Sequence, residues 1–340
     1  MAEGRCMQRR APGRLTEPPY RGWSGALVAG VTVVMVLAFA LTGGVAVAAT
    51  DRSSKRKART SPVLASPVRA PTRTDDASSE GTGAVGAPYA VRTVTVSLYD
   101  AARDRTINAT IYAPDANGEF PLVVMVHGYA AAASDYETLD AEVAAAGFVV
   151  AAPDFPESSR AVTTSPSRDI VGQATDVSFV LDQLLTPETV PAPLFGSIAD
   201  GPVGVMGHSD GGVTAAGVAF NSAAADPRIG AAVIMSGGAF EFSGSWFSGD
   251  NTPALLAIHG TADAVNPYAS SQSLYDEANG AKWLVAVDGG SHSGPFTSDP
   301  SVIDVGALIA GFLHAYLEGD ATAAAQLPAL ADTGALSLAS

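Results

Sequence analysis

Short, uninterrupted runs of apolar residues recur after residue 90 and predict buried strands. The six runs lie at residues 122–126, 148–152, 203–206, 231–235, 254–258 and 284–287. Strands have this composition when both of their faces are covered, as in a parallel sheet with helices on each side. Earlier in the chain, residues 91–97 and 106–112 are rich in β-branched side chains and predict an antiparallel pair.

Segments with helical character lie between most of these runs. They cover residues 134–146, with Ser134 as the expected N-cap, and residues 169–185, 213–219, 268–279 and 301–317. Strands that alternate with helices predict an α/β fold, here a mostly parallel, doubly wound sheet of about eight strands flanked by helices. We expect this domain to span residues 89–320 and an Ala-rich tail to follow at 321–340.

The first 88 residues have a different composition. Residues 1–24 form a basic leader, and residues 25–49 carry no charge and exceed the ~20 apolar residues that cross a bilayer as a helix. Small residues at the end of this segment fit a signal-peptide cleavage site. We therefore predict an exported protein, either secreted or anchored to the membrane, with residues 50–88 as a disordered spacer.

Charge and cysteine content narrow the possible partners. Residues 1–89 hold 12 Lys and Arg against 6 Asp and Glu, whereas residues 90–340 hold 7 against 28. The acidic part lacks the clustered basic residues that nucleic acid binding needs, so we exclude nucleic acid as a partner. The single cysteine, Cys6, rules out an intrachain disulfide, and no two histidines have the spacing of a zinc helix, so we expect neither metal nor cofactor.

The candidate chemistry begins at Gly207-His208-Ser209-Asp210-Gly211, a G-x-S-x-G pattern between a predicted strand and a predicted helix. In that context the serine sits on a sharp turn, and the flanking glycines leave room for the turn. We predict Ser209 as the nucleophile. We also predict an oxyanion hole made by the backbone N–H groups of Asp210 and of Tyr129, which follows an earlier strand. The negative side chain of Asp210 suits this role only if it points away.

Two further candidates follow later strands in the order that this fold requires. A serine hydroxyl needs a base to take its proton, and the base needs a carboxylate to fix its tautomer. Asp263 and His292 supply these groups after the strands predicted at 254–258 and 284–287. Asp288 is a rival acid, but it lies at a strand end, close to His292 in the sequence. We therefore predict a triad of Ser209, Asp263 and His292.

The other histidines are expected to support the site or to lie outside it. We expect His208 to pack beside the serine turn. We expect His127 to brace the loop that carries Tyr129, here called the oxyanion loop. His259 is interpreted as structural, and His314 is expected on a helix far from the site.

Aromatic residues cluster between residues 237 and 253, where there is no room for a large lid domain. Phe240 and Trp246 are candidates for lining the substrate pocket. Packing within the loop is an equally plausible role for both side chains.

Three segments together carry a resemblance to a known family: His127-Gly128-Tyr129, residues 207–212 and Gly289-Gly290-Ser291-His292-Ser293. They resemble the α/β-hydrolase superfamily, and more narrowly its dienelactone-hydrolase, chlorophyllase-like and bacterial cutinase (polyester hydrolase)-like branch. The resemblance covers roughly residues 90–320. It implies an α/β-hydrolase fold and a lidless serine esterase that acts on a small-molecule or lipid-like ester. Polyester-cleaving members usually carry Met where this chain has Asp210.

Three functions remain open at this point. The first, favoured by the ordered triad, is a serine carboxylic-ester hydrolase that works through an acyl-enzyme. The second is an acyl hydrolase or transferase on a cell-envelope lipid, thioester or peptide, which the export segment suggests. The third is a non-catalytic surface binding protein on a hydrolase scaffold, which the unusual Asp210 suggests.

Overall fold

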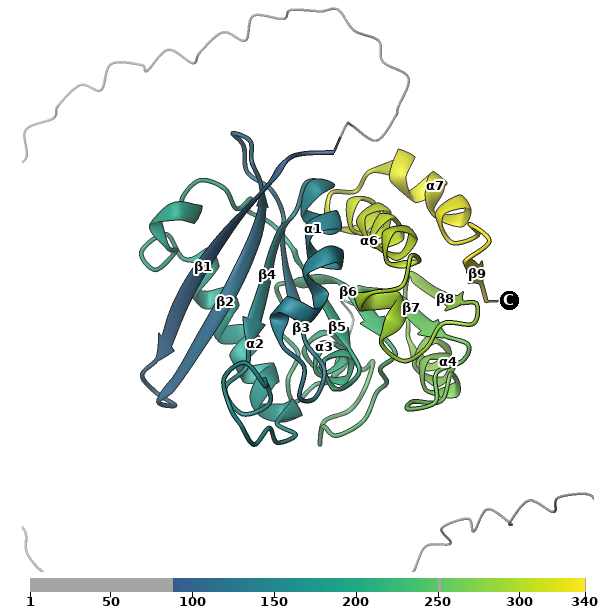
Figure 1. Ribbon diagram of the computed structural model, residues 1–340, viewed down its shortest axis with the longest axis horizontal. Coiled ribbons are helices and arrows are strands. Elements are labelled where there is room, and N and C mark those ends of the chain that lie inside the picture. The colour runs from purple at the N-terminus through teal and green to yellow at the C-terminus, as the bar shows by residue number, and fades with distance from the viewer. Residues whose placement is uncertain (1–87, 250–251, 340) are drawn as a thin grey trace, which may run out of the picture. The chain divides into compact units, whose positions relative to one another are not determined.

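A single nine-stranded sheet organises the computed structural model, which describes residues 88–249 and 252–339 of the chain (Figure 1). The strands are β1 (Val91–Asp100), β2 (Arg105–Pro114), β3 (Leu122–Val126), β4 (Val149–Asp154), β5 (Val203–His208), β6 (Ile229–Met235), β7 (Ala254–Gly260), β8 (Lys282–Val287) and β9 (Leu336–Leu338). Their spatial order is β1-β2-β4-β3-β5-β6-β7-β8-β9. All six apolar runs are therefore strands, and they form the central part of the sheet.

The strands from β3 to β8 pair in parallel, while β2 pairs antiparallel with both β1 and β4, and β9 pairs antiparallel with β8. This arrangement is the α/β-hydrolase fold that the resemblance implies. It confirms the prediction of a mostly parallel, doubly wound sheet. Because the central strands are parallel, the loops that follow β3, β5, β7 and β8 meet at one edge of the sheet.

Helices cover both faces of the sheet and create two hydrophobic cores. The helices are η1 (Ala133–Tyr136), α1 (Glu137–Ala145), α2 (Ile170–Leu185), η2 (Ala192–Leu194), α3 (Asp210–Phe220), α4 (Ala269–Glu277), α5 (Gly294–Thr297), α6 (Val302–Leu317) and α7 (Ala321–Leu330). Helices α2, α3 and α4 pack on one core, and α1, α6 and α7 pack on the other. Each fully buried Leu, Ile or Phe in these cores contributes about 1.5–3 kcal/mol to folding.

The start of the first helix differs from the prediction. Ser134 is not an N-cap but lies inside η1, and the Asp135 carboxylate instead accepts the backbone N–H of Ala132 at 3.0 Å. The side chain of Arg160 also binds this carboxylate. The N-cap is thus Ala132, and the Asp135 side chain reaches back to its backbone N–H.

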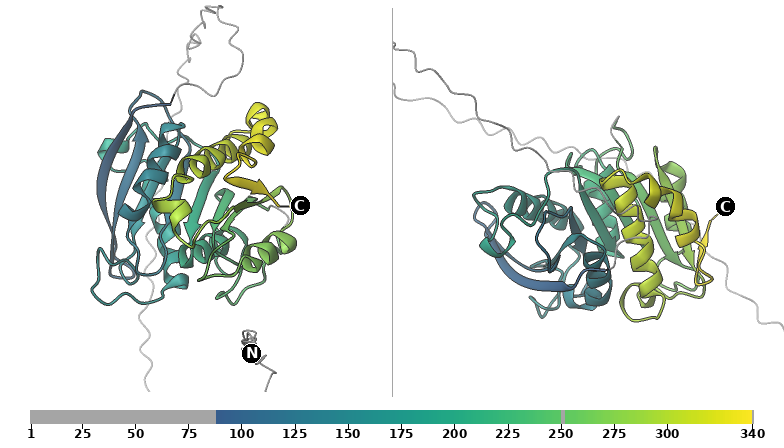
Figure 2. Two further views of the ribbon diagram at one scale, coloured as in Figure 1. Left: turned by 45° about the vertical axis from the view of Figure 1, so that its right-hand side comes forward. Right: turned by 90° about the horizontal axis from the view of Figure 1, so that it is seen from above.

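Residues beyond 320 continue the folded domain instead of forming a tail. Helix α7 is capped by Asp320 and packs along α6 (Figure 2), and β9 adds the ninth strand beside β8. Leu327 is fully buried against the second core. At the contact between α6 and α7, a Cβ on Gly311 would lie 2.5 Å from Cδ1 of Leu330, so this side chain would have to shift.

The predicted leader, apolar segment and spacer lie outside the described residues. Within residues 88–249 and 252–339, no helix has both the length and the apolar content needed to span a bilayer.

Candidate active site

Ser209 occupies a strained turn between β5 and α3. Its backbone has φ 57° and ψ −122°, a conformation that costs an L-residue about 1–3 kcal/mol. A Cβ at Gly207 would lie 2.2 Å from the carbonyl oxygen of Gly211, and a Cβ at Gly211 would lie 2.1 Å from that of Val126. Only glycine fits at these two positions, as the G-x-S-x-G pattern predicts.

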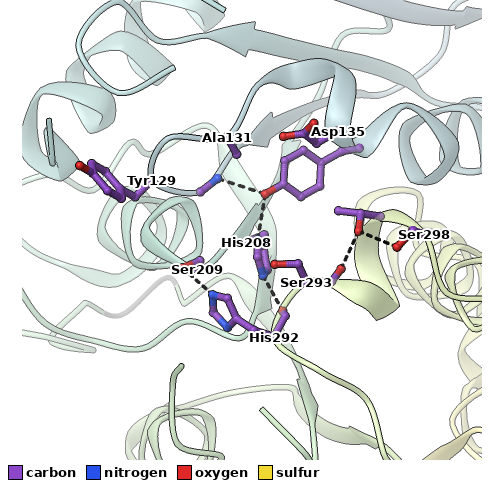
Figure 3. A pocket seen from close by; sticks show the side chains of 11 residues that line it. Tyr129, Ala131, Asp135, His208, Ser209, His292, Ser293 and Ser298 are labelled. Carbon is purple, nitrogen blue, oxygen red and sulfur yellow. Dashed lines mark hydrogen bonds between the residues drawn. The ribbon is translucent and has the colours of Figure 1, made fainter. Parts of the chain in front are cut away.

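The side chains of Ser209, His292 and Asp263 meet in a hydrogen-bonded line at the carboxyl edge of the sheet. His292 Nε2 lies 2.9 Å from Ser209 Oγ (Figure 3), and His292 Nδ1 lies 2.8 Å from Asp263 Oδ2. Because a carboxylate only accepts, Nδ1 carries the proton that it donates to Asp263. Nε2 is then free to accept the serine hydroxyl, which is the arrangement that a general base requires.

The Asp263 carboxylate is buried and has donors on both oxygens. Oδ1 accepts the backbone N–H groups of Val265 and Asn266 at 2.8 and 2.9 Å, and His259 Nε2 lies 3.2 Å from Oδ2. Burial acts to raise the pKa of Asp263, but the hydrogen bond from His292 and those from the two amides outweigh it and hold the pKa below its usual value. Asp263 is therefore a stable anion beside His292.

His259 contacts Asp263 directly, whereas the sequence predicted a purely structural role for it. Its Nδ1 accepts the Ser271 hydroxyl at 2.8 Å, and its Nε2 faces Asp263 and the carbonyl of Asn266, 3.1 Å away. Burial lowers the pKa of His259. The neutral ring therefore helps to fix the Asp263 carboxylate in place.

The backbone amides of Tyr129 and Asp210 are the predicted donors of the oxyanion hole. Among the described residues, neither N–H donates a hydrogen bond. The loop that carries Tyr129 passes close to the serine, since a Cβ at Gly128 would lie 3.2 Å from Ser209 Cβ. A hydrogen bond of 3.1 Å from the Ala131 N–H to the Gly128 carbonyl holds this oxyanion loop in a turn.

The Asp210 side chain has a partner that the sequence did not indicate. Arg168, in the segment between β4 and α2, binds the carboxylate with two parallel hydrogen bonds, Nε to Oδ2 and Nη2 to Oδ1, both of 2.8 Å. Its Nη1 lies 3.3 Å from Oε1 of Glu241. The negative charge next to the serine turn is therefore paired.

A buried network around His208 connects three loops of the site. His208 Nε2–H donates to the backbone carbonyl of His292 at 2.7 Å (Figure 3), and Nδ1 accepts the hydroxyl of Tyr136 at 2.8 Å. The Tyr136 oxygen in turn accepts the Gly128 N–H at 3.2 Å. Burial and the neighbouring His292 lower the pKa of His208 to about 4, so the ring is neutral. Sequence reasoning placed His208 beside the turn but missed Tyr136.

His127 and His314 lie where the sequence suggested. His127 is buried; its Nδ1–H donates to the Gly128 carbonyl at 2.8 Å, and its Nε2 accepts the Phe155 N–H at 3.1 Å. It thereby contacts the oxyanion loop. His314 lies on α6 and faces the carbonyl of Ala146.

A cavity of about 440 Å³ opens beside Ser209 and His292. This volume falls in the range of roughly 300–1,000 Å³ that is typical of small-molecule sites. The other residues that line it are Gly128, Tyr129, Ala131, Asp135, Tyr136, His208, Ser293, Thr297 and Ser298.

The sequence candidates that lie outside this cavity include Phe240, Trp246 and Asp288. Phe240 is 41% exposed and Trp246 packs against neighbouring aromatic rings, so the structure favours loop packing over a place in the pocket wall. Asp288, the rival acid, is exposed and accepts a hydrogen bond from Ser337 of β9. Aromatic composition alone does not distinguish a pocket wall from a packed loop.

Metal-ligating residues do not cluster in the described part of the chain. Across residues 88–249 and 252–339, no group of three His, Cys, Asp or Glu side chains could hold a metal ion.

A family model matches part of the chain. A search of curated proteins finds no match to the chain. The model of the chlorophyllase family matches residues 85–237, which contain the oxyanion loop and the serine turn but neither Asp263 nor His292. The narrower likeness to dienelactone hydrolases and cutinases stays a prediction. The chain thus has an α/β-hydrolase fold and is similar, over residues 85–237, to the chlorophyllase family of the α/β-hydrolase superfamily.

Proposed function

We propose that this protein is a serine carboxylic-ester hydrolase that works through an acyl-enzyme. Ser209 is the nucleophile, His292 is the general base and acid, and Asp263 holds the tautomer of His292. The observation that carries the proposal is the position of the His292 ring, which is hydrogen-bonded to Ser209 through one nitrogen and to Asp263 through the other.

In the first half of the reaction, His292 Nε2 takes the Ser209 proton as Oγ attacks the ester carbonyl carbon. The carbonyl oxygen becomes an oxyanion, which the N–H groups of Tyr129 and Asp210 stabilise. The imidazolium then gives its proton to the leaving alcohol as the C–O bond breaks. Asp263 keeps its negative charge throughout and stabilises the positive ring.

In the second half, water attacks the acyl-enzyme. His292 takes a proton from this water, a second oxyanion forms between the same two amides, and Ser209 leaves with the proton that His292 returns. The products are one alcohol and one carboxylic acid for each ester bond, and the enzyme is regenerated.

The similarity to chlorophyllases supports an ester as the substrate, and the cavity volume supports a small-molecule or lipid-like ester. The composition of residues 25–49 supports an enzyme that acts after export. The alternative of a non-catalytic binding protein was based on the unusual Asp210. The ion pair with Arg168 provides a reason for this carboxylate, so the alternative has less support.

Two variants of the triad, each with a matched control, test this proposal with p-nitrophenyl butyrate as the substrate. Ser209→Ala removes the nucleophile, and we expect kcat to fall on the order of 10⁴-fold or more. Asp263→Asn presents the wrong tautomer of His292 and is expected to cost on the order of 10⁴-fold. The controls Ser337→Ala and Asp288→Asn alter the hydrogen-bonded pair that joins β9 to the end of β8 and should keep the parent rate.

Covalent labelling gives an independent readout. A fluorophosphonate should modify the parent protein once, at Ser209, and should leave Ser209→Ala unmodified in intact-mass measurements. Ester hydrolysis by Ser209→Ala at the parent rate, or a parent protein without labelling, would refute the proposed mechanism.

A further inference from the structure

The placement of a carboxylate on the residue that offers an oxyanion donor is an electrostatic problem for the proposed reaction. In the proposed reaction the Asp210 N–H stabilises the developing negative charge, and the side chain of the same residue is a carboxylate. An unpaired unit charge at roughly 6 Å, in an effective dielectric constant of about 20, slows a step that builds negative charge on the order of 100-fold. An unpaired Asp210 carboxylate would therefore destabilise the oxyanion that the Asp210 N–H is proposed to stabilise.

Arg168 is built to neutralise that charge. Its planar guanidinium binds Asp210 through two hydrogen bonds of 2.8 Å, the bidentate geometry in which arginine binds a carboxylate most strongly. The Asp210 side chain is only 15% exposed, so water screens it poorly. Glu241, the second partner of Arg168, is 45% exposed and depends less on the pairing.

The segment that carries Arg168 is held from both sides. On one side, the Tyr129 hydroxyl donates to the Pro166 carbonyl at 3.0 Å. On the other side, Arg105 binds Asp169 at 2.9 Å, just before α2. The chain on both sides of Arg168 is thus held in place, and one of the anchors, Tyr129, supplies the other amide of the proposed oxyanion hole.

We propose that Arg168 is a positioning residue of the esterase, which holds the Asp210 carboxylate away from the oxyanion and cancels its charge. The inference rests on the proposed function. It assigns to Arg168 no contact with the substrate, and it requires the charge of Arg168 and not only its hydrogen bonds. Arg168 therefore acts through Asp210, and its effect should depend on the charge of Asp210.

Charge-conserving and charge-removing variants distinguish this role from simple anchoring of the loop. Arg168→Lys keeps the positive charge, whereas Arg168→Gln keeps a hydrogen-bond donor and loses the charge. We expect Arg168→Gln to lower kcat for p-nitrophenyl butyrate about 10- to 100-fold with KM unchanged, and Arg168→Lys to keep most of the parent kcat. The rate of fluorophosphonate labelling should fall in the same proportion, because that reaction also builds negative charge beside Ser209.

The decisive comparison repeats the change in the Asp210→Asn background. The Arg168→Gln/Asp210→Asn double variant lacks both charges, so its kcat should recover to within about threefold of the parent value. Arg228→Gln is the matched control, since Arg228 makes a similar bidentate pair with Asp226, and neither residue belongs to the proposed triad or oxyanion hole. It should lower stability at most and leave kcat unchanged. Thermal unfolding of each variant verifies that it is folded.

Several outcomes would overturn the inference. Equal losses of kcat in Arg168→Lys and Arg168→Gln would indicate anchoring of the loop. A double variant that stays as slow as Arg168→Gln alone would indicate direct contact of Arg168 with the substrate. An unchanged kcat in Arg168→Gln would refute the inference while leaving the esterase proposal intact. A parent protein that neither hydrolyses esters nor labels at Ser209 would refute both.

Discussion

Tyr136→Phe is the sharpest probe of the buried network behind the serine turn. The change removes one oxygen, which accepts the Gly128 N–H and donates to His208 Nδ1. Tyr136 is 2% exposed and His208 is 3% exposed, so both side chains are buried. The phenylalanine ring keeps the packing and leaves two buried polar groups unpaired.

The structure sets the magnitude of the expected effect. A buried polar group that loses its partner costs about 1–3 kcal/mol, and the two groups belong to one network, so their costs do not simply add. On that basis we expect the free energy of unfolding to fall by about 2–4 kcal/mol. We also expect kcat for p-nitrophenyl butyrate to fall about tenfold, because His208 orients the backbone of His292 and Gly128 belongs to the oxyanion loop.

Denaturant unfolding, with the midpoint and slope fitted separately, measures the loss of stability. Tyr99→Phe is the matched control, since its hydroxyl binds Asp104 on a side chain that is 58% exposed. That variant should change stability by less than about 0.5 kcal/mol. If Tyr136→Phe is as stable and as active as Tyr99→Phe, the network contributes nothing and the reasoning is refuted.

Three further predictions concern the rest of the domain. Burial raises the pKa of Asp140 well above its usual value, so the stability that this group contributes is present below the unfolded pKa and is lost as pH rises through the folded pKa. Asp140→Asn should remove that loss. In urea unfolding, the stability advantage of Asp140→Asn over the parent should therefore grow from about pH 4 upwards. Gly211→Ala would place a Cβ 2.1 Å from the Val126 carbonyl oxygen, so we expect an unfolded or inactive protein, and a folded, fully active variant would contradict this reading of the turn. Leu327→Ala should lower the free energy of unfolding by about 2–5 kcal/mol if α7 belongs to the core. A variant that unfolds at the same temperature as the parent would show that α7 does not belong to the core.

The strands and the serine turn were predictable because their causes are local in the sequence. A run such as residues 122–126 is apolar throughout only when both of its faces are covered, and Gly207 and Gly211 are required by the backbone on either side of Ser209. The meeting of Asp263 with His292 followed from topology, since parallel strands end at one edge.

The residues that sequence reasoning missed depend on side-chain directions between distant segments. Tyr136 and His208 are 72 positions apart, and Arg168 and Asp210 are 42 apart. No periodicity links such pairs, and a tyrosine or an arginine in a loop has many possible partners. The segment at 321–340 was predicted as a tail because alanine gives a weak pattern, although it forms α7 and β9.

The position of β9 has a consequence for the integrity of the sheet. It pairs with β8 from Val285 to Val287, at the end of the sheet nearest the loop that carries His292. Without this strand, β8 would expose unpaired backbone N–H and C=O groups that attract the strands of other molecules. Proteolytic trimming of the last few residues would therefore create a site for aggregation directly beside the proposed general base.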